Sequence, residues 1–383
     1  MSELFLLHFP RILMVICGVW RLPYFKSKKV QTVYDIFSIF LQFTFSLMCL
    51  SMFFELVNLI NTWNVLNLIE FSRVALSSYL CIIKALVLRN SSIQRIMVYM
   101  IKEERNVLRS KHQQPKALYM DTVKLINRVS FLLLLVVLPT LLAFSADCLR
   151  KGIIDFDDAV KYVYLPLIDQ KKYKTVQLTV QTIFINLIGF YYCMTQAFMV
   201  TAMKFAQGQL ELLQLYFREF DYYAARQSTT EIAYLKTLLE YHQKIIHFVE
   251  TLNKEMRLVI IIEFFFSAVN IACSLFTLLT MATNLIDILF SVNCLVFLLA
   301  QLAILSYLGN EIYQAGLNIA SASYELKWYE KNREFQKNLL LVIKRSQKPL
   351  VLSVGPLGPL TNETFVSVLK ASYSYFNLMT RYN

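Results

Sequence analysis

The chain has 383 residues, of which 57% are hydrophobic and 14% aromatic, and its mean hydropathy is positive. This composition is too apolar for an ordinary soluble globular protein and predicts a membrane protein. A net charge of +12 is compatible with nucleic-acid binding. However, the basic residues are concentrated in alternate segments between apolar runs, which is the pattern of a multi-pass membrane protein rather than of a nucleic-acid-binding surface.

Six apolar runs, each long enough to cross a bilayer as a helix, precede the C-terminal segment. They cover residues 33–60, 68–88, 129–146, 176–203, 258–280 and 287–308. A further helix is expected from Thr364 onward, because no Gly or Pro follows that residue. The sequence therefore predicts an all-α membrane protein with seven transmembrane helices.

The distribution of Lys and Arg predicts the orientation of this bundle. The segment from Arg89 to Arg128 holds nine basic residues, and segments 204–257 and 310–348 hold seven each, whereas the turns after the first and fifth runs hold none. We therefore expect the N-terminus in the cytosol and the C-terminus outside. This orientation leaves Cys148 as the one cysteine predicted on the outer face.

A long cytosolic helix is predicted from Glu231, because no Gly or Pro interrupts the sequence before Thr280. At 1.5 Å per residue, this helix would be about 75 Å long and would extend well beyond a bilayer of about 30 Å. Its start resembles a capping box, Ser228-Thr229-Thr230-Glu231. Its apolar stripe predicts packing against helices in 204–220, 311–330 and 333–345. The stripe consists of Ile232, Leu235, Leu239, Ile246, Val249 and Met256. We expect His242 on the surface of this helix and Lys84 to snorkel from an inner membrane boundary.

No catalytic constellation is apparent in the sequence. The four histidines are dispersed, and His242 and His247 are five residues apart, which does not place them on one helical face as a metal pair. There is no phosphate-binding glycine loop, nucleophile elbow or paired-cysteine motif. We therefore expect neither an enzyme nor a bound cofactor or metal.

The outer halves of the second to sixth spans combine many apolar and aromatic side chains with a few isolated polar ones. A pocket for a small volatile molecule needs this mixture, although core packing explains it equally well. The candidate ligand-binding residues are Leu76, Tyr79, Val137, Thr140, Phe144, Asn186, Phe190, Met194, Phe276 and Asn293.

A stripe of mostly small residues follows the last helix at a spacing of about 3.5 residues. It consists of Ser367, Ala371, Ser374, Leu378 and Arg381. Such a stripe is suited to a water-lined axis. The alternative is that small residues let neighbouring membrane helices approach closely.

The C-terminal region resembles the signature of insect odorant receptors. The resemblance lies in the run RSQKP, the Thr364-Phe365 helix start and the run SVLKASYSYFNLM. Further similarity lies at Gly18-Val19-Trp20-Arg21-Leu22-Pro23, Gly309-Asn310 and Trp328-Tyr329. The related gustatory receptors would be expected to end in a TY…QF pattern, which Ser374-Tyr375-Phe376 does not match.

This resemblance implies an odorant-gated cation channel subunit, assembled as a tetramer with shared odorant co-receptor subunits in the dendritic plasma membrane of olfactory neurons. It implies that the terminal helices line one pore and that Leu378 forms part of a hydrophobic gate. Because four arginines would oppose cations at a pore mouth, Arg381 argues for a heteromer. The alternatives are a G-protein-coupled receptor, a gustatory receptor-like channel or a transporter. No nucleic-acid partner is expected.

The expected organisation divides the chain into six segments. They are a cytosolic N-terminal segment (1–32), transmembrane helices 1–4 with the ligand pocket (33–203), cytosolic anchor helices (204–257), transmembrane helices 5 and 6 (258–308), further anchor helices (309–354) and the pore helix (355–383).

Overall fold

The computed structural model describes residues 8–20, 27–62, 65–110, 112–154, 162–163, 172–226, 230–280 and 285–381. Within these ranges the structure is almost entirely helical, with one isolated β-bridge between Ser353 and Pro359. The helices are α1 (His8–Ile16), α2 (Lys28–Thr62), α3 (Val65–Leu88), α4 (Ser91–Arg109), α5 (Gln113–Ile154), α6 (Lys174–Arg218), α7 (Phe220–Arg226), α8 (Glu231–Thr280), α9 (Leu285–Tyr324), α10 (Arg333–Ser346) and α11 (Asn362–Arg381).

Six of these helices are long and apolar enough to cross a membrane, namely α2, α3, α5, α6, α8 and α9. Each contains one of the six predicted apolar runs. The seventh is α11, which has 20 residues and packs against α8 and α9. The predicted all-α, seven-helix membrane fold is therefore confirmed, and the chain is a multi-pass membrane protein.

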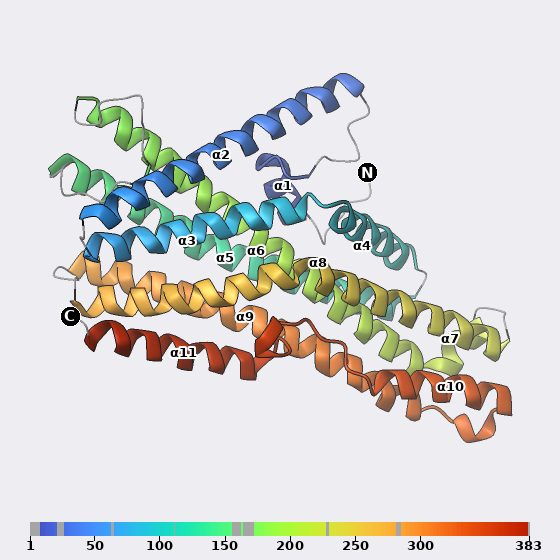
Figure 1. The fold of residues 1–383 in the computed structure, drawn as a ribbon. Coiled ribbons are helices and arrows are strands. Elements are labelled where there is room, and N and C mark those ends of the chain that lie inside the picture. Colours follow the sequence, from blue (N-terminus) through green and yellow to red (C-terminus); the bar gives the residue numbers. More distant parts are fainter. Residues whose placement is uncertain are drawn as a thin grey trace.

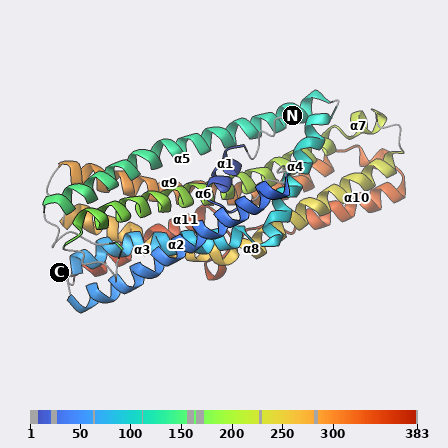
Figure 2. The ribbon, with the colours of Figure 1, turned by 90° about the horizontal axis from the view of Figure 1, so that it is seen from above.

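Helix α6 is the centre of the bundle. It packs against α1, α3, α5, α8 and α9, and its residues from Cys193 to Leu210 are all buried. Two views of the ribbon show α6 running along the length of the molecule with other helices around it (Figures 1 and 2). A helix that is buried on all sides, as this part of α6 is, is typical of the core of a large helical protein.

Several long helices continue beyond their apolar parts and form what we call the helical extension. It consists of α4, α7 and α10 with the adjoining ends of α6, α8 and α9, and it lies at the opposite end of the molecule from the C-terminus (Figure 1). The predicted long helix is confirmed as α8, which has 50 residues. Leu235, Val249 and Met256 of its predicted stripe are buried.

The start of α8 differs from the predicted capping box. The Thr230 hydroxyl accepts a hydrogen bond from the backbone N–H of Ala233 at 3.3 Å, so Thr230 caps this helix, while Ser228 and Thr229 lie outside the described residues. The prediction that His242 lies on the helix surface was wrong. His242 is buried, because it shares the packed face of α8 with Leu235 and Val249.

The N-terminal residues fold back into the bundle between α2 and α6. The hydroxyl of Tyr191 on α6 donates to the Cys17 carbonyl at 2.9 Å, and Gln42 on α2 donates to the same carbonyl at 3.0 Å. Gly18 turns the chain here with φ +66°, a conformation that glycine adopts without strain. The family-like Gly18-Val19-Trp20 sequence is thus a buried turn, with Val19 and Trp20 each 4% exposed.

The segment before α11 makes a tight reversal that positions the last helix. The backbone N–H of Val354 donates to the Gly358 carbonyl at 2.8 Å, and that of Leu360 donates to the Leu352 carbonyl at 2.6 Å. A Cβ at Gly309 on α9 would lie 2.4 Å from the Leu360 carbonyl oxygen. Glycine at this position therefore allows α9 and the start of α11 to lie in close contact.

Candidate functional site

Polar side chains connect three of the helices on which ligand-binding residues were predicted. Asn293 on α9 donates to the Thr140 hydroxyl on α5 at 2.6 Å. Asn186 on α6 donates to the Ser145 hydroxyl on α5 at 2.9 Å. The structure thus brings Thr140 and Asn293 together, and their hydrogen bond leaves one oriented polar pair in mainly apolar surroundings.

Two residues between α5 and α6 were missed by the sequence analysis. Tyr162 packs between Phe71 on α3 and Phe144 on α5, with ring centroids 6.1 and 5.7 Å away. Buried side chains of α6 hold this short segment in place: Gln181 accepts from the Tyr162 N–H at 3.1 Å, and Gln177 donates to the Val163 carbonyl at 2.5 Å. Tyr162 therefore forms part of the aromatic wall beside Phe144.

The remaining predicted ligand residues occupy different environments. Val137 and Met194 are buried in the main core, whereas Leu76 is half-buried on α3. Tyr79 donates to the Cys49 carbonyl at 3.3 Å.

Two of the predicted residues lie apart from this group. Phe190 is 39% exposed on the surface of this chain. Phe276 is buried in a separate cluster with Ile69 and Cys273, against which Phe376 and Met379 of α11 pack. The structure therefore associates Phe276 with the last helix.

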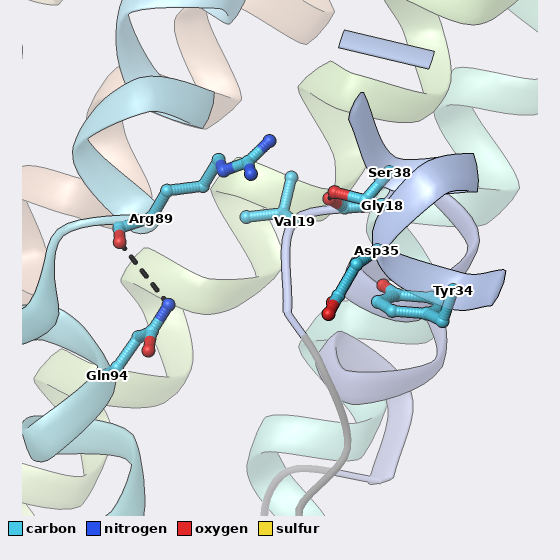
Figure 3. A pocket seen from close by; sticks show the side chains of 7 residues that line it. All are labelled: Gly18, Val19, Tyr34, Asp35, Ser38, Arg89 and Gln94. Atoms are coloured by element: carbon cyan, nitrogen blue, oxygen red, sulfur yellow. Dashed lines mark hydrogen bonds between the residues drawn. The ribbon is translucent and has the colours of Figure 1, made fainter. Parts of the chain in front are cut away.

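A cavity of about 230 Å³ lies where α2, α3, α4 and the N-terminal turn meet (Figure 3). It includes none of the predicted ligand residues. Within it, the Gln94 side chain donates to the Arg89 carbonyl at 3.3 Å. Its lining residues are Gly18, Val19, Tyr34, Asp35, Ser38, Arg89 and Gln94.

Lys84 corrects another expectation, because it does not snorkel. Its side chain is 1% exposed, and its ammonium lies 2.7 Å from Oε1 of Glu263, which is 0% exposed. Gln196 on α6 and Gln301 on α9 also donate to this carboxylate oxygen. The sequence offered a signal for this group, because apolar runs of two different helices contain ionisable residues of opposite charge, and each would be costly to bury alone.

The predicted pore stripe lies mainly on the face of α11 that its own chain leaves uncovered. Ser367, Ser374 and Leu378 are exposed, with Leu378 at 56%, and Ala371 is half-buried. An adjacent face, with Thr364, Val368 and Ser372, is buried. The small residue at the helix contact is thus Ser372, which is not in the stripe. The Arg381 side chain lies outside what the structure describes.

Comparison with known proteins supports an assignment over most of the chain. The family model described as 7tm Odorant receptor matches residues 64–373. Odorant receptor 10 of Aedes albopictus is 31% identical over 48% of this chain and 49% of its own length. Odorant receptor Or2 of Anopheles gambiae is 34% identical over 40% of both chains. The chain thus spans half or less of the length of these two curated relatives.

The solved structures of olfactory receptor OR5 from Machilis hrabei have the same fold. The complex of OR5 with eugenol matches with a TM-score of 0.80 at 16% identity, covering 98% of this chain and 97% of that one. A second structure of OR5 matches with a TM-score of 0.77 at 17% identity. The proteins of this family are receptors rather than enzymes. From the family match and this fold, we conclude that the chain belongs to the insect 7tm odorant receptor family.

Proposed function

We propose that the chain is a subunit of an odorant-gated cation channel, in which a small volatile organic molecule bound within the membrane opens a central pore. The observation that carries this proposal is the uncovered stripe of α11. Ser367, Ser374 and Leu378 are exposed in this chain, although α11 packs on α8 and α9 along an adjacent face. A membrane helix with an exposed small and hydroxylated face is suited to a shared water-lined axis.

The subunit needs partners to complete such an axis, because one α11 cannot enclose a pore. We propose a tetramer with shared odorant co-receptor subunits in the dendritic plasma membrane of olfactory neurons. Arg381 supports a mixed assembly, since one arginine diluted among other subunits opposes cations less than a ring of four. The helical extension, with cytosolic segments 204–257 and 309–354, is proposed to anchor subunits to one another, and residues 355–383 to form the pore segment.

The proposed ligand pocket lies between α3, α5, α6 and α9 in segment 33–203 and the adjoining part of α9. Thr140 and Asn293 supply its polar pair, and Phe144 and Tyr162 supply an aromatic wall. Leu76, Tyr79, Val137, Asn186 and Met194 remain proposed members of this pocket. Phe190 and Phe276, which lie apart from this group in the chain, remain proposed ligand contacts. Affinity for a volatile molecule would come mostly from burial of apolar surface, at about 25 cal/mol per Å².

The proposal is tested by recording cation currents from cells that express the chain with and without an odorant co-receptor, while a panel of volatile organic compounds is applied. We expect at least one compound to evoke a current that requires both subunits and that persists when G-protein signalling is blocked. A response that disappears with G-protein blockade would instead support a metabotropic receptor.

A further inference from the structure

The Lys84–Glu263 group stands apart from both the proposed ligand pocket and the proposed pore. Four helices each supply one buried polar side chain to it, and we call this group the junction: Lys84 from α3, Gln196 from α6, Glu263 from α8 and Gln301 from α9. Three donors converge on one atom, Oε1 of Glu263. The Lys84 ammonium also lies 5.5 Å from the centre of the Tyr192 ring.

The two carboxylate oxygens of Glu263 differ in their hydrogen bonding, because all three donors contact Oε1. Oε2 of Glu263 and Oε1 of Gln301 are buried, and neither has a hydrogen-bond partner among the described residues. Leaving a buried carboxylate oxygen without a donor is unfavourable, and such groups in native proteins are satisfied by protein atoms or by internal water. A neutral molecule with two O–H groups satisfies both acceptors without adding charge to a group that already contains an ion pair.

The junction links helices that carry proposed ligand residues to the helices that support α11. Lys84 lies five residues after Tyr79 on α3, and Gln196 lies two residues after Met194 on α6, so these helices also carry proposed ligand residues. Glu263 and Gln301 belong to α8 and α9, the helices on which α11 packs. A movement that separates the first pair from the second has to disturb an ion pair in an apolar environment.

We propose that the junction binds one internal water molecule between Glu263 Oε2 and Gln301 Oε1, and that this hydrated ion pair fastens α3 and α6 to α8 and α9 in the closed channel. The water site depends on the junction alone, whereas its role in the closed state rests on the proposed channel function. Weakening the junction then favours the open state and raises current in the absence of odorant.

The first test measures the melting temperature of the purified full chain in a double-mutant cycle. Lys84→Met and Glu263→Met each leave one buried charge unpaired, so each is expected to lower the melting temperature by roughly 5 °C or more, whereas the double variant recovers more than half of that loss. Lys84→Arg keeps the charge and is expected to retain most of the stability. The matched control is the Lys236–Glu334 ion pair, whose charged atoms are 3.2 Å apart and whose side chains are both exposed. Substituting these two residues should lower the melting temperature only slightly, and the two effects should be additive. Additive decreases in melting temperature for the Lys84 and Glu263 substitutions would show that this ion pair does not hold the helices together.

The second test measures resting current in cells that express the chain with a co-receptor, as the inward current lost when sodium is replaced by N-methyl-D-glucamine. Gln301→Leu leaves the ion pair in place but removes the proposed water acceptor, and we expect it to raise resting current several-fold per surface-labelled subunit. The Lys124→Met control, at an exposed lysine outside the proposed anchor segments, should leave that current unchanged. Unchanged current in Gln301→Leu and in the Lys84→Met/Glu263→Met double variant, with a conducting wild type, would overturn the role in closing.

The third test is a cryo-electron microscopy map of the chain in lipid nanodiscs at a resolution that shows water. Density within hydrogen-bond distance of both Glu263 Oε2 and Gln301 Oε1 is expected. A dry junction in which the Tyr192 hydroxyl donates directly to Glu263 Oε2 would overturn the water site. If co-expression of the wild-type chain added no current to that of the co-receptor alone, the proposed channel function would fail. The melting-temperature cycle and this map would still decide whether the junction binds an internal water molecule and holds the four helices together.

Discussion

At the residue scale, His242 shows how the helical extension changes the chemistry of a side chain. Burial, with the positive charge of Arg345 nearby, lowers the pKa of His242 from 6.5 to about 4. The folded chain therefore binds fewer protons than the unfolded chain between these pH values. The stability contributed by neutral His242 is fully present above about pH 6.5 and is lost as pH falls toward 4, by roughly 3 kcal/mol in total.

This dependence predicts the behaviour of His242→Gln, which keeps a polar side chain but does not titrate. The difference in melting temperature between wild type and variant should be constant above pH 7 and should shift in favour of the variant between pH 6 and 4.5. Thermal unfolding of the purified chain across this pH range provides the measurement. Parallel curves for the two proteins would show that His242 does not carry this pH dependence.

The ligand pocket makes a second prediction at this scale. Phe144→Ala removes a ring that packs on Tyr162, so the concentration of an activating odorant that gives half-maximal current should rise roughly 10-fold or more. Dose–response recordings with a co-receptor measure this change. Phe131→Ala is the matched control on the same helix, because Phe131 is 63% exposed, and its dose response should match that of wild type. Equal effects of the two substitutions would remove Phe144 from the site.

At the scale of elements, α11 carries the clearest prediction. Leu378→Ser replaces an exposed aliphatic side chain of the proposed hydrophobic gate with a wettable one, so the closed constriction should conduct more readily. We expect a several-fold higher resting current per surface-labelled channel, measured by whole-cell recording without odorant. Wild-type resting current and wild-type ion selectivity in this variant would place the gate elsewhere.

The helices themselves were largely predictable from the sequence, because hydropathy locates membrane spans and Gly and Pro limit helix lengths. The 50-residue α8 follows from the lack of either residue between Glu231 and Thr280. The contacts of individual side chains were less predictable. Lys84 was assigned to the membrane boundary because it was considered alone. Its partner Glu263 is 179 positions away in sequence, and only the packing of α3 on α8 brings the two together.

The candidate site shows the same limit. Thr140 and Asn293 were both selected as isolated polar residues in apolar spans, and the structure pairs them. Tyr162 lies in a charged connection where no periodic pattern marks it, so its packing between Phe71 and Phe144 could not be derived locally. Phe276 was selected by its depth in the span. Its contact with α11 depends on the rotation of α8, which hydropathy does not determine.

At the scale of the whole molecule, the distribution of basic residues predicts that α4 and the helical extension lie in the cytosol. A cysteine introduced at Ser110, the C-cap of α4, should therefore resist an impermeant thiol reagent in intact cells and react after permeabilisation. Asn61→Cys, exposed at the end of α2 on the opposite side of the bundle, is the control that should react in intact cells. A Cys148→Ser background removes the native cysteine predicted outside. Labelling of Ser110→Cys before permeabilisation would reverse the orientation.

The pore-lining role of α11 is tested most directly by comparing two of its serines that are two residues apart. Ser374 is exposed on the proposed pore stripe, and Ser372 is buried against the bundle. Each is replaced by Cys, and the current evoked by an activating odorant is recorded with a co-receptor before and after a positively charged methanethiosulfonate reagent. A pore lined by the exposed stripe predicts that the reagent reduces the current of Ser374→Cys and leaves that of Ser372→Cys unchanged. An unchanged current in Ser374→Cys, or equal reduction in both variants, would contradict a pore lined by this face of α11.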